Sequence, residues 1–321
     1  MNNRKTEQGL RNKAKALLEQ SKVDCIIGYE LGSLKFITTP LIARDKDSAD
    51  RLVINPFIVG NLSVYLTELK GRVGIVAKGC DSRSIVSLIQ DNQVKREDVV
   101  ILGVPCSGTI DMTKVERLVG KDRDEIDDIA WEDSEVTITV ASDRKEFHIS
   151  EILFDDCLDC EFSIPQEYDI LLGESSSLVI DKVASRKTIE ALKAMPQEQR
   201  WNFWAKEFSR CIRCYACRNV CPACFCERCF VEESEPQWIA PVPWWQDNLI
   251  FQVTRNIHVA GRCTNCGECE RVCPMNISLR NLTKEMCNIV DDLYHFNAGT
   301  DKEAAPLMTH YEATDPEDFI K

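Results

Sequence analysis

Cysteine dominates the chemistry that this sequence could perform. The chain contains 17 cysteines, and eleven of them lie between Cys211 and Cys273. Eight of those eleven form two copies of one spacing, Cys-x-x-Cys-x-x-Cys-x-x-x-Cys-Pro, which ends at Pro222 in the first copy and at Pro274 in the second. This run is typical of bacterial ferredoxins that hold two 4Fe-4S clusters. The sequence therefore predicts a pair of such clusters.

The two runs are expected to exchange one ligand. In two-cluster ferredoxins, the fourth cysteine of each run binds the other cluster, and we expect this cysteine to open a helix. The ligands assigned to one cluster are Cys211, Cys214, Cys217 and Cys273, and those assigned to the other are Cys263, Cys266, Cys269 and Cys221. A pair of zinc knuckles is the alternative, but the proline after each fourth cysteine and the duplication favour iron-sulfur clusters.

The connection between the two runs carries three more cysteines, Cys224, Cys226 and Cys229, and Cys287 is a candidate fourth member of the group. Three interpretations are open: ligands of a further iron-sulfur or zinc site, redox-active thiols, or buried cysteines packed against the clusters. Cys25, in an expected strand, is interpreted as a core residue.

Four cysteines nearer the N-terminus, Cys80, Cys106, Cys157 and Cys160, form a second candidate site. Cys80 lies between an expected strand and an expected helix, where backbone amides stabilise a thiolate. Cys106 ends the next expected strand, and the carboxyl ends of parallel strands share one edge of a sheet. The four thiolates would complete a third 4Fe-4S cluster. Scattered core cysteines, and a zinc or redox Cys-x-x-Cys turn, are the alternatives.

The elements that must position these cysteines have the pattern of an α/β domain followed by a cysteine-rich one. Strands are expected over 23–28, 72–77, 99–104, 135–140, 146–153 and 168–172, and helices over 5–20, 82–90, 186–210 and 247–260. The alternation favours a mostly parallel sheet covered by helices, and Pro196 should break the third helix.

Three parts are predicted along the chain. Residues 1–185 form an α/β domain, residues 186–290 a ferredoxin-like dicluster domain of α+β or helical character, and residues 291–321 an acidic tail. We expect this tail to be mobile or to dock on a partner.

Composition excludes several functional classes. Asp and Glu number 52 against 39 Lys and Arg, a net charge of -13, so the chain lacks the basic stripe that nucleic acids require. No apolar run approaches the roughly 18 residues of a membrane span, and Met1 to Lys15 does not read as a secretory signal. We therefore expect a cytoplasmic protein. Because the cytosol keeps thiols reduced, its cysteines are expected to ligate metal rather than to form disulfides.

The order of the motifs resembles the beta subunits of hydrogenases and formate dehydrogenases that reduce the deazaflavin coenzyme F-420. The resemblance covers roughly residues 20–290 and is carried by Ala77-Lys-Gly-Cys80, Gly103-Val-Pro-Cys106, Cys157-Leu-Asp-Cys160, Pro165 and Tyr168-Asp-Ile-Leu-Leu-Gly173. It implies that Cys80, Cys106, Cys157 and Cys160 hold a 4Fe-4S cluster. It also implies a domain that often holds FAD, which exchanges a hydride with the deazaflavin.

The chain departs from that family in two respects. Its dicluster segment follows the flavin-type domain, and it has no Gly-x-Gly-x-x-Gly fingerprint, so flavin ligands cannot be assigned and FAD stays open. Lys78 beside Cys80 either contacts a flavin or tunes the cluster by its charge. The order resembles versions associated with heterodisulfide-reductase-type complexes and with formate dehydrogenases that use other acceptors.

The resulting hypothesis is an iron-sulfur electron-transfer subunit of a multi-subunit oxidoreductase. It would relay electrons between a catalytic formate dehydrogenase or hydrogenase subunit and a heterodisulfide-reductase-like flavoprotein or other acceptor. No catalytic residue is assigned, because no molybdopterin or nickel-iron site is recognised. One alternative is an FAD-containing enzyme that reduces deazaflavin or another soluble carrier at its own flavin, and another is a zinc-stabilised scaffold.

Overall fold

The structure is a computed structural model that describes residues 3–132, 134–173 and 182–315 of the 321-residue chain. It divides into two compact units. Residues 1–82 and 95–185 form the first unit, and residues 83–94 and 186–321 form the second. None of the described helices is long and apolar enough to cross a bilayer.

The first unit contains a five-stranded sheet with the order β2-β1-β3-β4-β8. The strands are β1 (Cys25–Leu31), β2 (Thr38–Ala43), β3 (Val73–Ala77), β4 (Val99–Gly103) and β8 (Ile170–Leu171). Strands β1, β3, β4 and β8 are parallel, whereas the edge strand β2 is antiparallel to β1. Every residue of β3 and β4 is buried, which explains why both segments are continuous apolar runs in the sequence.

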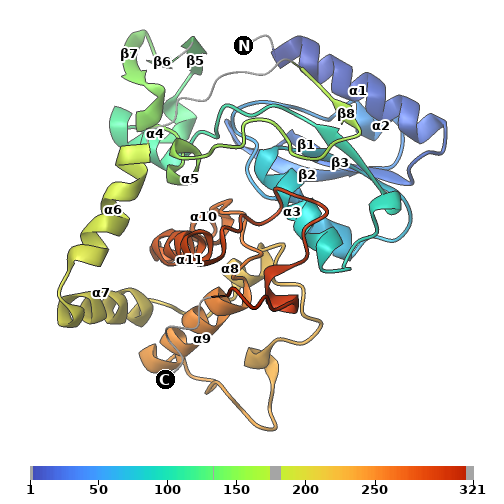
Figure 1. The fold of residues 1–321 in the computed structure, drawn as a ribbon. Helices are drawn as coiled ribbons and strands as arrows, with labels where there is room; N and C mark the ends of the chain where they lie inside the picture. Colours follow the sequence, from blue (N-terminus) through green and yellow to red (C-terminus); the bar gives the residue numbers. More distant parts are fainter. Residues whose placement is uncertain (1–2, 133, 174–181, 316–321) are drawn as a thin grey trace. The chain divides into compact units, whose positions relative to one another are not determined.

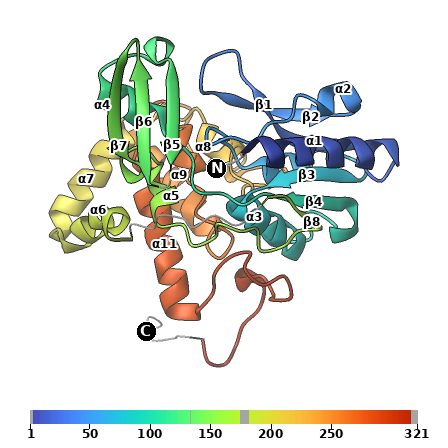
Figure 2. The ribbon, with the colours of Figure 1, turned by 90° about the horizontal axis from the view of Figure 1, so that it is seen from above.

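Three helices accompany this sheet: α1 (Asn3–Glu19), α2 (Lys46–Ala49) and α3 (Gly79–Gln90). Leu10 and Ala14 on the apolar stripe of α1 are fully buried, and they belong to one core cluster with Ile26, Val76 and Leu102 of the sheet. Figure 2 shows α1 lying along the sheet. Helix α3 starts two residues after β3, earlier than the predicted residue 82, so that Cys80 lies within its first turn.

A second, antiparallel sheet was not predicted. It consists of β5 (Asp128–Glu132), β6 (Glu135–Val140) and β7 (Asp143–His148), and it packs with α4 (Met112–Val119) and α5 (Asp155–Leu158). The segments 135–140 and 146–153 were expected as strands, without assignment to a sheet. The first is β6, whereas the second begins within β7 and continues as a 3-10 helix. A tight turn with Ala141 at a φ of 53° joins β6 and β7 as an antiparallel pair, because a parallel pair would need a long crossover.

The described part of the second unit is helical. Its helices are α6 (Lys182–Ala194), α7 (Gln197–Ser209), α8 (Ala216–Asn219), α9 (Trp245–His258), α10 (Glu268–Arg271) and α11 (Leu279–Tyr294) (Figure 1). The break predicted at Pro196 is present, because this residue caps α7 directly after α6 ends. Short 3-10 helices also occur in the chain, at Leu62–Thr67, Arg96–Asp98, Arg123–Glu125, Ile149–Glu151, Phe230–Glu232 and Leu307–Thr309.

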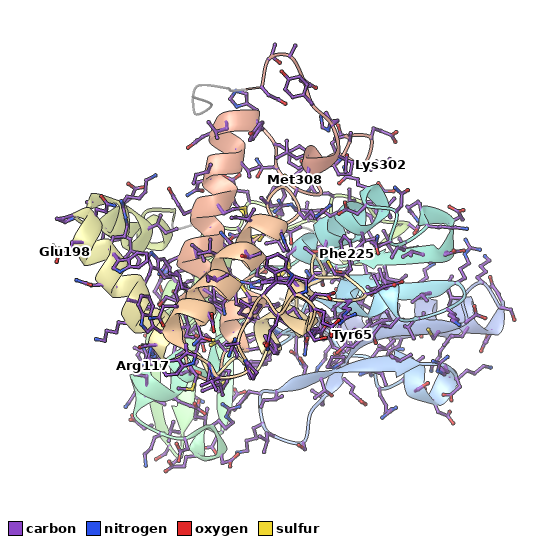
Figure 3. All side chains as sticks on the ribbon, turned by 90° about the horizontal axis from the view of Figure 1, so that it is seen from below. Tyr65, Arg117, Glu198, Phe225, Lys302 and Met308 are labelled. Carbon is purple, nitrogen blue, oxygen red and sulfur yellow. The ribbon has the colours of Figure 1, made fainter. Side chains whose placement is uncertain are left out.

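The segment that follows α11 contacts residues of α3 that belong to the same unit. Arg83 Nε donates a hydrogen bond to the Ala298 carbonyl at 2.9 Å, and Gln90 Nε2 donates to the carbonyls of Asp301 and Ala304 at 2.8 and 2.7 Å. Residues 298–304 of the predicted tail are therefore held by side chains of α3. Met308 beyond these contacts is exposed (Figure 3), and residues 316–321 of the predicted tail lie outside the described residues.

Candidate iron-sulfur centres

Three of the four N-terminal cysteines gather around the loop that follows β4. Cys106 lies in this loop, Cys157 lies on α5, and Cys160 follows that helix. The Cys106 sulfur accepts the Gly108 amide and the Cys157 sulfur accepts the Thr109 amide, both at 3.4 Å. Burial raises the pKa of the Cys157 thiol well above its usual value, and the neighbouring Cys106 and Cys160 raise it further. These three sulfurs thus share one buried environment.

A glycine lets the segment after Cys160 pass close to the helical turn that carries Cys80. Gly79 opens α3 directly before Cys80, and a Cβ at this glycine would overlap the carbonyl oxygen of Phe162. The segment after Cys160 therefore passes against the first turn of α3. The Cys106 amide donates to the Ser163 carbonyl at 2.8 Å in the same segment. The structure thus places the predicted ligands on elements that meet beyond the carboxyl ends of β3 and β4.

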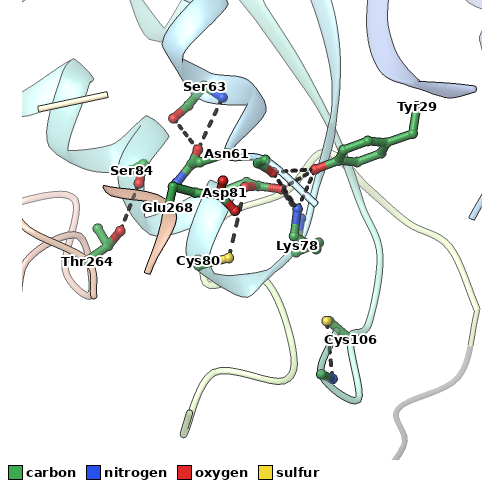
Figure 4. A network of polar contacts seen from close by, with 12 residues as sticks. Tyr29, Asn61, Ser63, Lys78, Cys80, Asp81, Ser84, Cys106, Thr264 and Glu268 are labelled. Atoms are coloured by element: carbon green, nitrogen blue, oxygen red, sulfur yellow. Dashed lines mark hydrogen bonds and ion pairs between the residues drawn. The ribbon is translucent and has the colours of Figure 1, made fainter. Parts of the chain in front are cut away.

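A buried charge network lies beside Cys80 (Figure 4). Lys78 Nζ pairs with Asp81 Oδ2 at 2.8 Å, donates to the Gly60 carbonyl at 3.0 Å and contacts the Tyr29 hydroxyl. Burial is the largest influence on the pKa of Lys78 and lowers it, but Asp81, Tyr29 and Cys80 together raise the pKa well above its usual value. The Lys78 charge in turn lowers the pKa of Cys106, although burial of that thiol raises it more. Lys78 therefore places a lasting positive charge near this site.

We expect Asp81→Asn to destabilise the first unit by about 3 kcal/mol, because it leaves the Lys78 charge buried without its counter-charge. Native-state hydrogen exchange at β1 and β3 amides measures this loss. Glu125→Gln is the matched control, since it breaks the exposed pair between Lys121 and Glu125, and such pairs contribute little. Equal protection of the β3 amides in the two variants would contradict this expectation.

The two ferredoxin-type runs have the same backbone conformation as well as the same spacing. Arg213 and Tyr215 in the first run have φ values of 50° and 60°, and the corresponding Asn265 and Gly267 in the second run have 55° and 73°. Left-handed residues of this kind turn successive amides toward one point, where anionic groups bind. Each run thus forms a tight loop suited to holding three thiolates around a cluster.

The fourth cysteines do not open helices, contrary to expectation. The third cysteine of each run, Cys217 or Cys269, lies on a one-turn helix, α8 or α10. Cys221 and Cys273 come two residues after these helices end. The proline that follows each of them removes a backbone donor, and the chain continues there in turns.

Each run has the fourth cysteine of the other run among its neighbours, and the exchange of ligands stays a prediction. Burial raises the pKa of Cys211, and Cys273 and Cys214 raise it further. Burial also raises the pKa of Cys266, to which Cys221 and Cys263 contribute. Cys273 thus lies near the first run, and Cys221 lies near the second.

Among the described residues, no three or more His, Cys, Asp or Glu side chains are placed to hold a single metal ion.

Two of the additional cysteines, Cys224 and Cys287, pack against one buried cluster together with Cys221 and Cys263. Cys224 forms a hydrogen bond with Cys221, which lowers the pKa of Cys224, and Cys287 does the same with Cys263. Cys226 is exposed. Cys25 is buried in β1, in agreement with its interpretation as a core residue.

Two side chains near the clusters were missed in the sequence. Gln252 on α9 donates through Nε2 to the sulfurs of Cys211 and Cys217 at 3.9 and 3.8 Å. Arg255, one turn further along α9, is almost fully buried. The sequence carries no clear signal for them, because a polar stripe on a helix ordinarily indicates its solvent-facing side.

Known proteins are similar to the chain in two ways: a domain family matches its cysteine-rich segment, and two curated relatives align with nearly its whole length. Residues 207–277 match the 4Fe-4S dicluster domain family. The "F420-dependent formate dehydrogenase subunit beta" of Methanocaldococcus jannaschii is 25% identical over 92% of this chain and 92% of its own length. The "F420-dependent formate dehydrogenase 1 subunit beta" of Methanococcus maripaludis is 23% identical over 92% of this chain and 91% of its own.

One solved structure, an F420-reducing nickel-iron hydrogenase complex from Methanosarcina barkeri, contains a chain that aligns with 59% of this chain and 71% of its own length. Its TM-score is 0.40 at 12% sequence identity. The curated relatives are named as subunits of oxidoreductases, and their alignments extend well beyond the cysteine-rich segment. The predicted resemblance is therefore confirmed: the chain is similar, along nearly its whole length, to the beta subunits of deazaflavin-dependent formate dehydrogenases.

Proposed function

We propose that this chain is the iron-sulfur electron-transfer subunit of a formate dehydrogenase or hydrogenase complex. The observation that carries the proposal is the pair of conformationally matched cysteine loops, each with the fourth cysteine of the other run nearby. The similarity to beta subunits of oxidoreductases supports the same assignment.

The proposed ligands form three groups. They are Cys211, Cys214, Cys217 and Cys273; Cys263, Cys266, Cys269 and Cys221; and Cys80, Cys106, Cys157 and Cys160. When bound, 4Fe-4S clusters supply one-electron transfer at potentials that their surroundings set. Phe208, Phe251 and Ile277 form a buried apolar cluster with Cys211 and Cys217, and they would exclude water from the first of these groups.

The partners are part of the proposal. The catalytic subunit follows from the relatives' names, and the heterodisulfide-reductase-like acceptor follows from the order of the sequence motifs. A catalytic formate dehydrogenase or hydrogenase subunit would exchange electrons with this chain, and a heterodisulfide-reductase-like flavoprotein or another carrier would complete the relay. We propose the division into residues 1–185, 186–290 and 291–321 for these roles, and a cytoplasmic location in which the thiols stay reduced.

A second candidate function is a flavoenzyme that reduces deazaflavin at its own FAD. The relatives' names, which include dependence on that carrier, favour it. Flavin analysis of the purified chain, combined with an assay of carrier reduction, separates the two functions. Stoichiometric FAD with carrier reduction by the chain alone supports the enzyme, and reduction only in the presence of a catalytic partner supports the relay.

We expect the isolated chain to oxidise neither formate nor hydrogen, because the cysteines with a proposed role are all assigned to relay chemistry. The measurement is anaerobic turnover of each substrate with an artificial acceptor, compared with the complex that contains the catalytic subunit. Turnover by the pure chain, free of molybdenum, tungsten and nickel, would overturn the relay.

A further inference from the structure

Helix α9 buries several polar side chains and exposes three apolar ones, although Phe251 on the same helix is buried. Ile250, Val253 and Ile257 are 49%, 38% and 55% exposed, whereas Gln252 and Arg255 are 1% and 3% exposed. This arrangement is the reverse of an ordinary surface helix. Burial of polar and charged groups is costly unless they find partners, so the inward face of α9 must meet groups that compensate for the cost.

The sulfurs of the first cysteine run are partners of this face. Gln252 Nε2 donates to the sulfurs of Cys211 and Cys217, and its Oε1 accepts from Arg255 Nε at 3.4 Å. Gln252 thus orients the guanidinium while its own amide group faces two proposed ligands of one cluster.

Arg255 contacts Gln252, and the neighbouring Phe251 packs with Cys217 and Cys269, which belong to different proposed clusters. The Nη2 atom of Arg255 is buried and has no hydrogen-bond partner among the described residues. Burial lowers its pKa, yet four cysteines raise it above its usual value: Cys269, Cys217, Cys221 and Cys224. Cys217 is a proposed ligand of one cluster, and Cys221 and Cys269 are proposed ligands of the other. A buried guanidinium ordinarily needs an anion, and thiolate-bound clusters would provide it here.

We propose that the positive charge of Arg255 sets the reduction potentials of both dicluster centres. This inference rests on the ligand assignment of the proposed function. Reduction adds one electron to a cluster, forms and breaks no bond, and makes the cluster more negative by one charge. The guanidinium stays protonated throughout, so the electron needs no accompanying proton from it. A fixed positive charge in a low-dielectric site favours the reduced form of each cluster.

The test is a redox titration of the full-length chain, assembled anaerobically and followed by electron paramagnetic resonance. We expect Arg255→Gln to lower both dicluster potentials by about 59 mV. For a one-electron couple, this shift means about a tenfold smaller ratio of reduced to oxidised cluster at a fixed potential. Arg255→Lys, which keeps the charge, should retain most of the wild-type potential. Arg228→Gln is the matched control, because Arg228 is exposed and pairs with Glu233.

Two results obtained with full iron content would overturn the proposal. One is an Arg255→Gln protein with full iron content and unshifted potentials, and the other is an Arg255→Lys protein whose potentials fall as far as those of the glutamine variant. If Arg255→Gln loses iron, the lysine variant decides: full iron with wild-type potentials supports the role of the charge, and iron loss there as well overturns it. A wild-type chain that lacks the two clusters would instead refute the proposed function.

Discussion

Replacing Cys273 by alanine is expected to destroy the cluster held by Cys211, Cys214 and Cys217, although Cys273 belongs to the other cysteine run. Cys273 packs with the apolar cluster around Cys211 and Cys217, and it raises the pKa of both thiols. A cubane that loses one of its four thiolates is lost or converted. We therefore expect a loss of about four iron atoms per chain.

Paired substitutions show which cluster has been lost. Cys273→Ala combined with Cys214→Ala should lose no more iron than either change alone, because both act on one cluster. Cys273→Ala combined with Cys266→Ala should lose about twice as much. Cys287→Ala is the control, since this thiol contacts Cys263 but is not an assigned ligand. The opposite pattern of additivity would show that each run holds its own cluster.

Gly79→Ala is expected to remove the N-terminal cluster without a change at any ligand. The added methyl group would meet the carbonyl oxygen of Phe162, and backbone atoms cannot move aside as the end of a side chain can. The segment after Cys160 would be displaced from the first turn of α3, which carries Cys80. We expect about four of about twelve irons to be lost, with unchanged paramagnetic resonance signals from the dicluster pair.

Two matched variants accompany this change. Cys106→Ser should give the same iron loss, because it alters a proposed ligand of the same cluster. Gly120→Ala should lose no iron: Gly120 caps α4 in the left-handed region with a φ of 68°, and no atom lies within 4 Å of the position of a Cβ. Full iron content in Gly79→Ala would contradict the proposed site.

The sequence predicted most reliably those elements whose signals are local. Strands β3 and β4 are uninterrupted apolar runs, and the helices α1, α7 and α9 follow the residue pattern within about two residues. The antiparallel sheet was not predicted, because the expected strands over 135–140 and 146–153 were not paired with each other. The tight turn that joins β6 and β7 at Ala141 has no glycine or asparagine to indicate it.

The missed parts of the candidate sites depend on residues far apart in the chain. Lys78 is held by Tyr29 and by the Gly60 carbonyl as well as by nearby Asp81, and no short-range pattern predicts the first two contacts. Arg255 lies on a helix that the sequence predicted, but its inward direction depends on the tertiary packing of α9 against the cysteine loops. A stripe of polar residues on such a helix is ordinarily interpreted as its solvent-facing side.

The measurement that tests the central claim most directly is the iron, acid-labile sulfide, zinc and flavin content of the anaerobically purified chain. The account predicts about twelve irons and about twelve sulfides per chain, as three cubanes require, and carrier reduction only when a catalytic partner is present. Zinc in place of iron would contradict the relay. So would stoichiometric FAD in a chain that reduces deazaflavin without a partner.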